Sequence, residues 1–449
     1  QGAVPATPAQ AWFLRHFETG RQHFNQAVLL HPRSPQKVTS LQTAVSALWR
    51  HHDALRTVER GTGLEILPAH HDIPLEVVTV ENESDRLSHT ERVHSEFDLK
   101  VGPLVRVVLY QLPSTQRLLI VAHHLVVDGV SWRLLVEDLS TALAQTEAGR
   151  SIDLGPRPLP ISQWVESLVP ADHDGDYWDP FLTEDPGAWP TPISDSPNRF
   201  GDTTTLDARL SSDLTQNLLT RAQHAFQTDV EDLLLLALGR ALQRWHHGAN
   251  TQVMMEGHGR ESRPGVPAPE DTVGWFTSLH PFRLVLVSDD PITQLKALKE
   301  ARRVIPHHGT TFGPRAFLME GPEFDRIVHA PLSFNYLGRF DDAPETMLAF
   351  AEESSGTPIG PDVIRLQEID AGAAVTGGAM GLSLTFGRHR YDEGAIQGLL
   401  DDWIHELARL IEICGNRTGV EATPADFTSK IFRLSEYEAM LQREGWAAT

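Results

Sequence analysis

The first half of the chain alternates helical and strand-like patterns of hydrophobic residues. Residues 41–49 repeat apolar side chains at helical spacing, and residues 104–110 and 118–121 are short apolar runs typical of strands. Residues 185–198 are rich in Pro, Gly, Ser and Asp, a composition that favours an irregular crossing. The pattern therefore predicts a first mixed α/β lobe over residues 1–184, followed by a crossing over residues 185–198.

The same alternation resumes beyond the crossing. Helical apolar spacing recurs over residues 213–226, 230–246 and 393–413. Short strand-like runs cover residues 253–255, 332–336 and 382–386. These elements predict a second α/β lobe over residues 199–430 and a C-terminal linker over residues 431–449.

Length and composition limit the class of protein. At 449 residues the chain exceeds one ordinary core and suits two lobes. It has no run of about 18 apolar residues and no charged-then-apolar start, so we expect neither a membrane span nor a secretory signal. The single Cys414 excludes an internal disulfide and fits a reducing cytoplasm, where we expect the protein. A net charge of −22 disfavours nucleic acid and anionic membranes as partners.

The stretch with the most chemical content is residues 122–132, which read AHHLVVDGVSW. A strand-like run ends at two histidines and a helical pattern follows, so a loop can hold His124 as a general base. Gly129 is expected to permit a turn that a side chain would crowd. Ser131 or Asp128 is expected to cap the helix.

Two simpler interpretations of these histidines also fit the sequence. A His-His pair often serves packing and hydrogen bonding alone. His124 and Asp128 stand four residues apart, a spacing that binds metals on helices. The preceding run predicts a strand instead, and no third ligand clusters nearby. We therefore expect no metal site.

Seven short motifs follow one another along the chain. They are TPAQAWF at 7–13, HFNQ at 23–26, HHLVVDG at 123–129, EGHGRE at 256–261, TVGWFT at 272–277, FNYLG at 334–338 and TPADF at 423–427. In wording and order they resemble the epimerization branch of the condensation-domain superfamily of nonribosomal peptide synthetases. Ordinary condensation domains lack EGHGRE, so the resemblance favours epimerization over amide formation.

The resemblance implies a fold and a reaction. The fold is two lobes of chloramphenicol acetyltransferase type, which form a V-shaped pseudo-dimer around a central cleft or tunnel. His124 and Glu256 are implied to act as acid and base on the Cα of an L-aminoacyl or peptidyl thioester. Deprotonation to an enolate and reprotonation on the opposite face would give an L/D mixture, which suits two groups with separated pKa values. From the residues alone, Glu256 could instead cap a turn or pair with Arg260.

Other residues are expected to support this pair. His123 is expected to be a buried hydrogen-bonding residue, and Asp128 to orient its loop by pairing with Arg56 or Arg260. Asn335 and Tyr336 are expected to position the thioester or its enolate, although a tyrosine near a strand end is often only packed. The side chains expected along the tunnel are Ser131, Trp132, Trp275 and Thr277.

The motifs that the chain lacks, together with the resemblance, determine what we expect of cofactors and partners. The chain has no phosphate-binding loop, dinucleotide motif, nucleophile elbow or Cys/His zinc spacing. We expect no intrinsic cofactor, with the substrate presented on the phosphopantetheine arm of a carrier protein. The resemblance implies an upstream carrier domain, a downstream condensation domain and a monomer when the domain is excised from its synthetase.

One stretch departs from the family pattern. Where PxxGxGYG is usual, residues 306–313 read PHHGTTFG, with Thr311 and Phe312 in place of glycine and tyrosine. Threonine is unfavourable at positive φ and phenylalanine cannot donate a hydrogen bond, so we expect another loop shape. Two rival functions stay open: an amide-forming condensation domain that shares His124, and a degenerate domain that only recruits a carrier protein.

Overall fold

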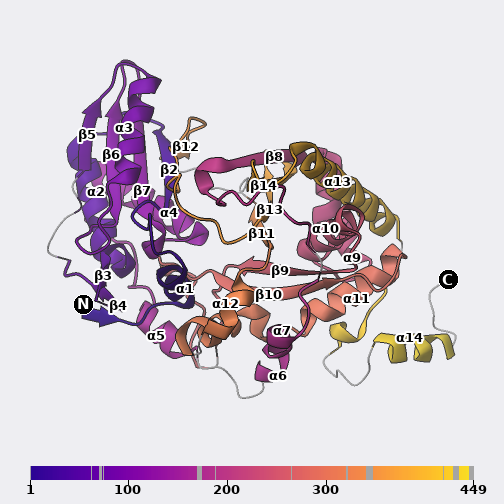
Figure 1. The fold of residues 1–449 in the computed structure, drawn as a ribbon. Coiled ribbons are helices and arrows are strands. Elements are labelled where there is room, and N and C mark those ends of the chain that lie inside the picture. Colours follow the sequence, from indigo (N-terminus) through magenta and orange to yellow (C-terminus); the bar gives the residue numbers. More distant parts are fainter. Residues whose placement is uncertain are drawn as a thin grey trace.

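In the computed structural model the chain forms two lobes, each built around its own β-sheet (Figure 1). The structure describes residues 2–61, 63–69, 73, 75–168, 174–187, 189–263, 265–319, 322–339, 347–417, 419–427 and 434–443. Helices pack on both sheets, which confirms the predicted α/β fold of two lobes.

The first lobe contains a five-stranded sheet with the order β12-β2-β7-β6-β5. Its strands are β2 (Asn25–Pro32), β5 (Leu75–Thr79), β6 (Val105–Gln111), β7 (Gln116–His123) and β12 (Leu348–Phe350). Its main helices are α2 (Val38–His51), α3 (Glu83–Ser95) and α4 (Gly129–Glu147). Alternate residues of β6 face opposite sides: Val107 faces α2 and α4, whereas Tyr110 hydrogen-bonds Thr90 of α3. Helices therefore cover both faces of this sheet.

Strand β12 comes from the second half of the chain and joins the lobes. It pairs antiparallel with residues 30–32 of β2, beside which it lies in Figure 1. Val273 and Trp275, also from the second half, are buried in the core of the first lobe. The lobes therefore share backbone hydrogen bonds and core side chains.

The opening motif caps helix α1 (Pro8–His16) and supports the histidine loop. The Thr7 hydroxyl accepts from the backbone N–H of Gln10, and the Gln10 side chain accepts from the backbone N–H of Thr7. The Gln10 amide also donates to the carbonyl of Leu125 at 2.7 Å. A small sheet with the order β1-β4-β3 lies nearby in the sequence, with β1 (Gly2–Val4), β3 (Thr57–Arg60) and β4 (Gly63–Ile66).

The second lobe contains a six-stranded sheet with the order β10-β9-β11-β13-β14-β8. Its strands are β8 (Thr203–Arg209), β9 (Asn250–Gly257), β10 (Ser278–Val285), β11 (Leu332–Arg339), β13 (Ile369–Thr376) and β14 (Ala379–Gly387). Its helices include α8 (Ser212–Leu219), α9 (Arg221–His224), α10 (Val230–His246), α11 (Pro291–Arg303), α12 (Asp325–Val328) and α13 (Glu393–Gly415).

The two faces of this sheet differ in chemistry. Strands β13 and β14 alternate buried and partly exposed residues, and their buried side chains pack against α10 and α13. The strand register aligns polar residues on the other face: Glu256 lies beside Asn335, and Ser333 beside Asp370. This face also carries the apolar Met254 and Leu279, and it bears the candidate site.

The chain enters the second lobe earlier than we predicted. After α5 (Ile161–Glu166) come α6 (Asp174–Trp178) and α7 (Pro180–Thr183). Trp178 and Phe181 share one apolar cluster with Met254 and Leu279 of the second-lobe sheet. Residues 174–184, expected in the first lobe, therefore pack on the second, because their aromatic rings are buried there.

The predicted C-terminal linker contains a helix, α14 (Leu434–Arg443). Glu438 of this helix lies 3.7 Å from Lys296 of α11, and the Tyr437 ring contacts Phe427. The rest of the predicted linker, residues 431–433 and 444–449, lies outside the described residues. Within the described part of the chain, no helix is both long enough and apolar enough to span a membrane.

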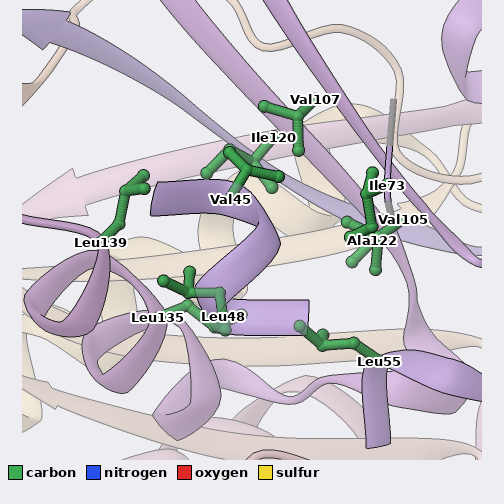
Figure 2. A pocket seen from close by; sticks show the side chains of 10 residues that line it. All are labelled: Val45, Leu48, Leu55, Ile73, Val105, Val107, Ile120, Ala122, Leu135 and Leu139. Atoms are coloured by element: carbon green, nitrogen blue, oxygen red, sulfur yellow. The ribbon is translucent and has the colours of Figure 1, made fainter. Parts of the chain in front are cut away.

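A small cavity of about 20 Å³ lies in the core of the first lobe (Figure 2). Its walls come from α2, α4, β6, β7 and neighbouring loops, and the lining residues are Val45, Leu48, Leu55, Ile73, Val105, Val107, Ile120, Ala122, Leu135 and Leu139. These side chains offer no hydrogen-bonding group, so the cavity is a gap in apolar packing. It includes neither His124 nor Glu256.

The departing stretch 306–313 packs into the second lobe. The indole Nε1 of Trp178 donates to Thr311 Oγ1 at 3.1 Å, and the Phe312 ring is fully buried. Left-handed backbone occurs before Thr311, at His307 with φ 45° and His308 with φ 54°. Threonine is tolerated at position 311 because the left-handed positions precede it. Thr311 and Phe312, the two residues that differ from the family pattern, both pack in the core of the second lobe.

Thr311→Val should lower the thermal unfolding midpoint of the protein. Valine keeps the side-chain shape but removes the acceptor of the buried Trp178 indole, and an unpaired buried donor costs about 1–3 kcal/mol. Thr39→Val, at an exposed position of α2, is the matched control and should leave the midpoint unchanged. Equal midpoints for the Thr311 variant and the wild type would contradict this role.

Candidate active site

The histidine loop begins where β7 ends at His123. Nδ1 of His123 accepts from the backbone N–H of Leu125 at 3.1 Å, and Nε2 donates to the carbonyl of Arg21 at 2.6 Å. Burial lowers the pKa of His123 to about 3, so the ring is neutral. Both nitrogens are occupied, which fits the expected buried hydrogen-bonding residue.

His124 follows as the first residue of a short helical turn, His124–Val126. Its ring lies against Trp275, with centroids 4.0 Å apart, and the ring of Phe24 is 5.9 Å away. The amide Nε2 of Gln26 lies 2.9 Å from Nε2 of His124. Burial lowers the pKa of His124 to about 4, despite opposing contributions from nearby backbone carbonyls and the Asp128 carboxylate. The imidazole is therefore an unprotonated base at neutral pH.

Asp128 fastens the loop to the second lobe. Its two carboxylate oxygens lie 2.8 and 2.9 Å from one guanidinium nitrogen of Arg260. They also accept from the backbone N–H of Ser131 at 2.8 Å and of Phe276 at 3.1 Å. Arg260 is thus the arginine that pairs, whereas Arg56 pairs with Asp53.

Two other residues of the loop differ from expectation. Ser131 is fully buried, and its hydroxyl donates to Asp128 and also contacts the backbone of Gly274, so it fastens the loop rather than lining a tunnel. Gly129 has no left-handed φ, and a Cβ there would meet nothing within 4 Å. The turn therefore does not require glycine. Asp128 is the residue that caps α4.

Glu256 lies near the end of β9, on the face of the second-lobe sheet opposite to α10 and α13. Asn335 of β11 is its register partner and donates its amide to Glu256 Oε2 at 2.8 Å. Burial and the nearby Asp370 carboxylate raise the pKa of Glu256 to about 7, and the Asn335 hydrogen bond opposes this rise. The carboxyl can therefore give or accept a proton near neutral pH.

The Asp370 side chain has two hydrogen-bond partners. The Ser333 hydroxyl donates to its Oδ1 at 2.6 Å, and the guanidinium of Arg365 donates to its Oδ2 at 2.6 Å. Arg365 is buried, which makes the pair a fixed part of the sheet. Asp370 therefore supplies a fixed negative charge beside Glu256.

The EGHGRE motif joins Glu256 to the segment that carries Trp275. A Cβ at Gly259 would overlap the carbonyl of Phe276, and Gly259 has a left-handed φ of 68°. Arg260 then reaches Asp128 across the lobes. Within five residues the motif therefore supplies the Glu256 carboxyl, the close backbone contact at Gly259 and the Arg260 guanidinium that binds the other lobe.

One short segment connects the two candidate groups. Trp275 contacts His124, and Leu279, four residues later, is the register partner of Glu256 in β9. Four residues of extended chain span at most about 14 Å, and paired strands lie about 5 Å apart. Thr277, expected along the tunnel, lies midway and is partly exposed.

Tyr336 does not face the candidate site. Adjacent strand residues point to opposite faces, and Tyr336 packs against the core that contains Phe334. Burial and the Glu231 carboxylate raise its pKa. Of the two residues expected to position the thioester, only Asn335 lies beside Glu256.

Three residues near the site were missed from the sequence. Gln26 and Gln10 belong to motifs that we recognised, but no role followed from their spacing. Asp370 belongs to no recognised motif, and only the parallel pairing of β11 and β13 brings it beside Ser333. Trp132, expected along the tunnel, is buried and donates to Gln26.

The described residues contain one cluster with metal-ligand spacing, His51, His52 and Asp138. His52, the residue after α2, places its Nε2 2.8 Å from Asp138 Oδ2 of α4, so a hydrogen bond accounts for this contact. Neither His124 nor Glu256 belongs to the cluster.

Comparisons with known proteins identify the family of the chain. Residues 1–431 match the family model of the condensation domain, and the chain belongs to the condensation-domain family. It is similar to the solved epimerization domain from the third module of tyrocidine synthetase B, with 31% identity and a TM-score of 0.84 over 92% of this chain and 97% of that chain. This similarity confirms the predicted resemblance to the epimerization branch.

Other relatives are much longer peptide synthases. Tyrocidine synthase 2 of Brevibacillus parabrevis is 32% identical over 98% of this chain, which spans 13% of that protein. Tyrocidine synthase 1 of the same organism is 30% identical over 98% of this chain, which spans 43% of it. The chain therefore corresponds to less than half of each of these two relatives.

Asp370→Asn should lower the pKa of Glu256 from about 7 toward its ordinary 4.5, because a neutral amide no longer repels the carboxylate. Wild-type Glu256 holds a proton more tightly in the folded than in the unfolded chain. Its deprotonation therefore costs stability as the pH rises from 4.5 to 7. This loss should shrink in Asp370→Asn and vanish in Glu256→Gln.

Thermal unfolding midpoints at the two ends of that pH window measure the effect. Asp370→Asn also removes the ion pair with Arg365, which lowers stability by the same amount at every pH in this window. Comparing the pH dependence within each variant therefore isolates the effect of Glu256. An Asp370→Asn protein with the same pH dependence as the wild type would contradict the assigned cause.

Proposed function

We propose that the domain inverts the Cα stereocentre of an aminoacyl or peptidyl thioester carried on the phosphopantetheine arm of a carrier protein. The observation that carries this proposal is Glu256, a carboxyl whose pKa is raised to about 7 beside Asn335. Two acid/base groups on opposite faces of Cα perform inversion most simply, whereas amide formation needs no second group. Inversion is therefore the function that these residues support best.

The two groups supply one base and one acid. At neutral pH His124, with a pKa of about 4, is unprotonated, and Glu256, with a pKa of about 7, is protonated in roughly half of the molecules. In the L-to-D direction the functional form of the pair has neutral His124 and protonated Glu256, and the reverse direction starts from the opposite protonation of both groups. Different environments thus separate the two roles.

The proton and electron movements balance across this pair. As Nε2 of His124 takes the α-proton, the electron pair of the C–H bond passes to the thioester carbonyl and forms an enolate. Glu256 then gives its proton to the opposite face of Cα. Exchange of protons with solvent resets the pair, and the reverse roles serve the other enantiomer. The expected product is an L/D mixture.

The carrier is proposed to reach the domain mainly through covalent linkage. A net charge of −22 leaves little surface for a large basic docking patch, and carrier proteins are usually acidic. Linkage in one synthetase raises the effective concentration without tight docking. The carrier domain is proposed to lie upstream and a condensation domain downstream, as the much greater length of the synthase relatives supports.

A carrier protein loaded with an L-aminoacyl or peptidyl group tests this function. After incubation with the domain and release of the thioester, chiral chromatography should detect the D form accumulating toward a mixture. A second carrier with a free aminoacyl amine should yield no dipeptide. Dipeptide without inversion would identify an amide-forming domain, and neither product over a range of side chains would support a recruiting domain.

A further inference from the structure

A chain of hydrogen bonds joins Trp132 through Gln26 to His124. The indole Nε1 of Trp132, on α4, donates to Oε1 of Gln26, on β2, at 2.8 Å. The amide Nε2 of Gln26 lies 2.9 Å from Nε2 of His124. Trp132 is 8% exposed, so its N–H group faces protein rather than water.

The indole fixes the direction of the second hydrogen bond. An indole N–H only donates, so the oxygen of the Gln26 amide faces Trp132 and the NH₂ group faces His124. An NH₂ group in turn only donates, so Nε2 of His124 accepts and carries no proton. The neutral imidazole therefore has its proton on the buried Nδ1.

We propose that Gln26 and Trp132 are positioning residues that hold His124 as an unprotonated base and oppose its protonated form; this inference rests on the proposed function. When His124 takes a proton at Nε2, the new N–H group faces the NH₂ group of Gln26. The amide cannot turn its oxygen toward that proton without breaking its bond to Trp132. This chain of hydrogen bonds from Trp132 through Gln26 to His124, the relay, therefore favours return of the proton to the substrate.

The hydrogen bond between Gln26 and His124 also determines which group the substrate must displace. In the substrate-free protein the Gln26 NH₂ group occupies the Nε2 lone pair, so the Cα–H group must replace it before proton transfer. The other groups around His124 are the rings of Phe24 and Trp275, the neutral His123 and the Asp128 carboxylate, which Arg260 already holds. The direct hydrogen-bond partner of Nε2 is therefore Gln26.

Substituting the relay should change the protonation of His124 in a defined order. In Gln26→Glu a carboxylate accepts from Nε2–H, so the pKa of His124 should rise from about 4 to its ordinary 6.5 or above. In Trp132→Phe the amide is free to turn its oxygen toward Nε2–H, so the pKa should rise by a smaller amount. A purely structural role for either residue predicts no such order.

Nitrogen-15 NMR titration of histidine-labelled protein measures this effect without turnover, with His124 signals assigned by their loss in His124→Gln. In the wild type at neutral pH these signals should report a proton on Nδ1. Because no substrate is needed, failure of the relay is distinguishable from failure of the proposed epimerization. In active protein, the acidic limb of the pH–rate profile for inversion should move to higher pH with the NMR pKa.

Trp49→Phe is the matched control, since this buried indole lies in the same core and its Nε1 has no hydrogen-bond partner among the described residues. Its His124 titration should equal that of the wild type. The proposal is overturned if Trp132→Phe leaves the His124 pKa unchanged or if Trp49→Phe raises it equally. Trp132→Phe decides the matter alone if Gln26→Glu does not fold.

Discussion

His124→Ala and Glu256→Gln should each reduce inversion by about 10²–10⁴-fold or more, the usual contribution of one acid or base to catalysis. Each change removes one member of a pair that must act on opposite faces of Cα. Glutamine keeps the shape of Glu256 but cannot transfer a proton. Chiral chromatography of the product released from a loaded carrier measures the loss.

Glu261→Gln is the matched control for this pair of variants. Glu261 belongs to the same EGHGRE motif but lies 3.4 Å from the exposed His258, away from Asn335. Its variant should invert at the wild-type rate. Near-native inversion by both the His124 and the Glu256 variants, with circular dichroism unchanged, would show that the assigned mechanism is wrong.

Asp128→Ala should destabilise the protein by about 3–5 kcal/mol, the range for breaking a buried ion pair by removing one partner. The Asp128 and Arg260 side chains are each 4% exposed. The substitution leaves the guanidinium of Arg260 buried without its counter-charge and also removes the acceptor of the Phe276 N–H. Denaturant unfolding and hydrogen exchange of residues 272–278 should both report the loss.

Glu65→Ala tests whether burial of the ion pair is the cause of the large destabilisation expected for Asp128→Ala. Glu65 pairs with Arg60 at 3.1 Å, with both side chains more than a third exposed, so its loss should cost less than about 1 kcal/mol. Comparable destabilisation by the two variants would contradict the assigned importance of the buried inter-lobe pair.

Local patterns predicted the elements that carry the site. The apolar run before His124 and the run of residues 253–255 before Glu256 both form strands, as expected from their short length and composition. Asp128 caps the helix that follows it, as its position before an apolar period indicated. These features depend on neighbours in sequence, which is why pattern and spacing sufficed.

Features that depend on distant partners were not predicted. Gln26 is 98 residues from His124, and a register of β2 against β7 is needed to bring them together. Asp370 acts on Glu256 through strand order, which no local pattern specifies. Trp178 was assigned to the wrong lobe because apolar periodicity indicates that a ring is buried but does not indicate which lobe it packs against.

The central claim is that His124 and Glu256 exchange the α-proton of a carrier-bound thioester from opposite faces. The most direct measurement is incubation of the L-loaded carrier in deuterated water, with chiral separation and mass of the released product. The wild type should yield D product containing one α-deuterium, and each single variant should yield no net inversion. D product that retains the original α-hydrogen, or equal inversion by both variants, would contradict the account.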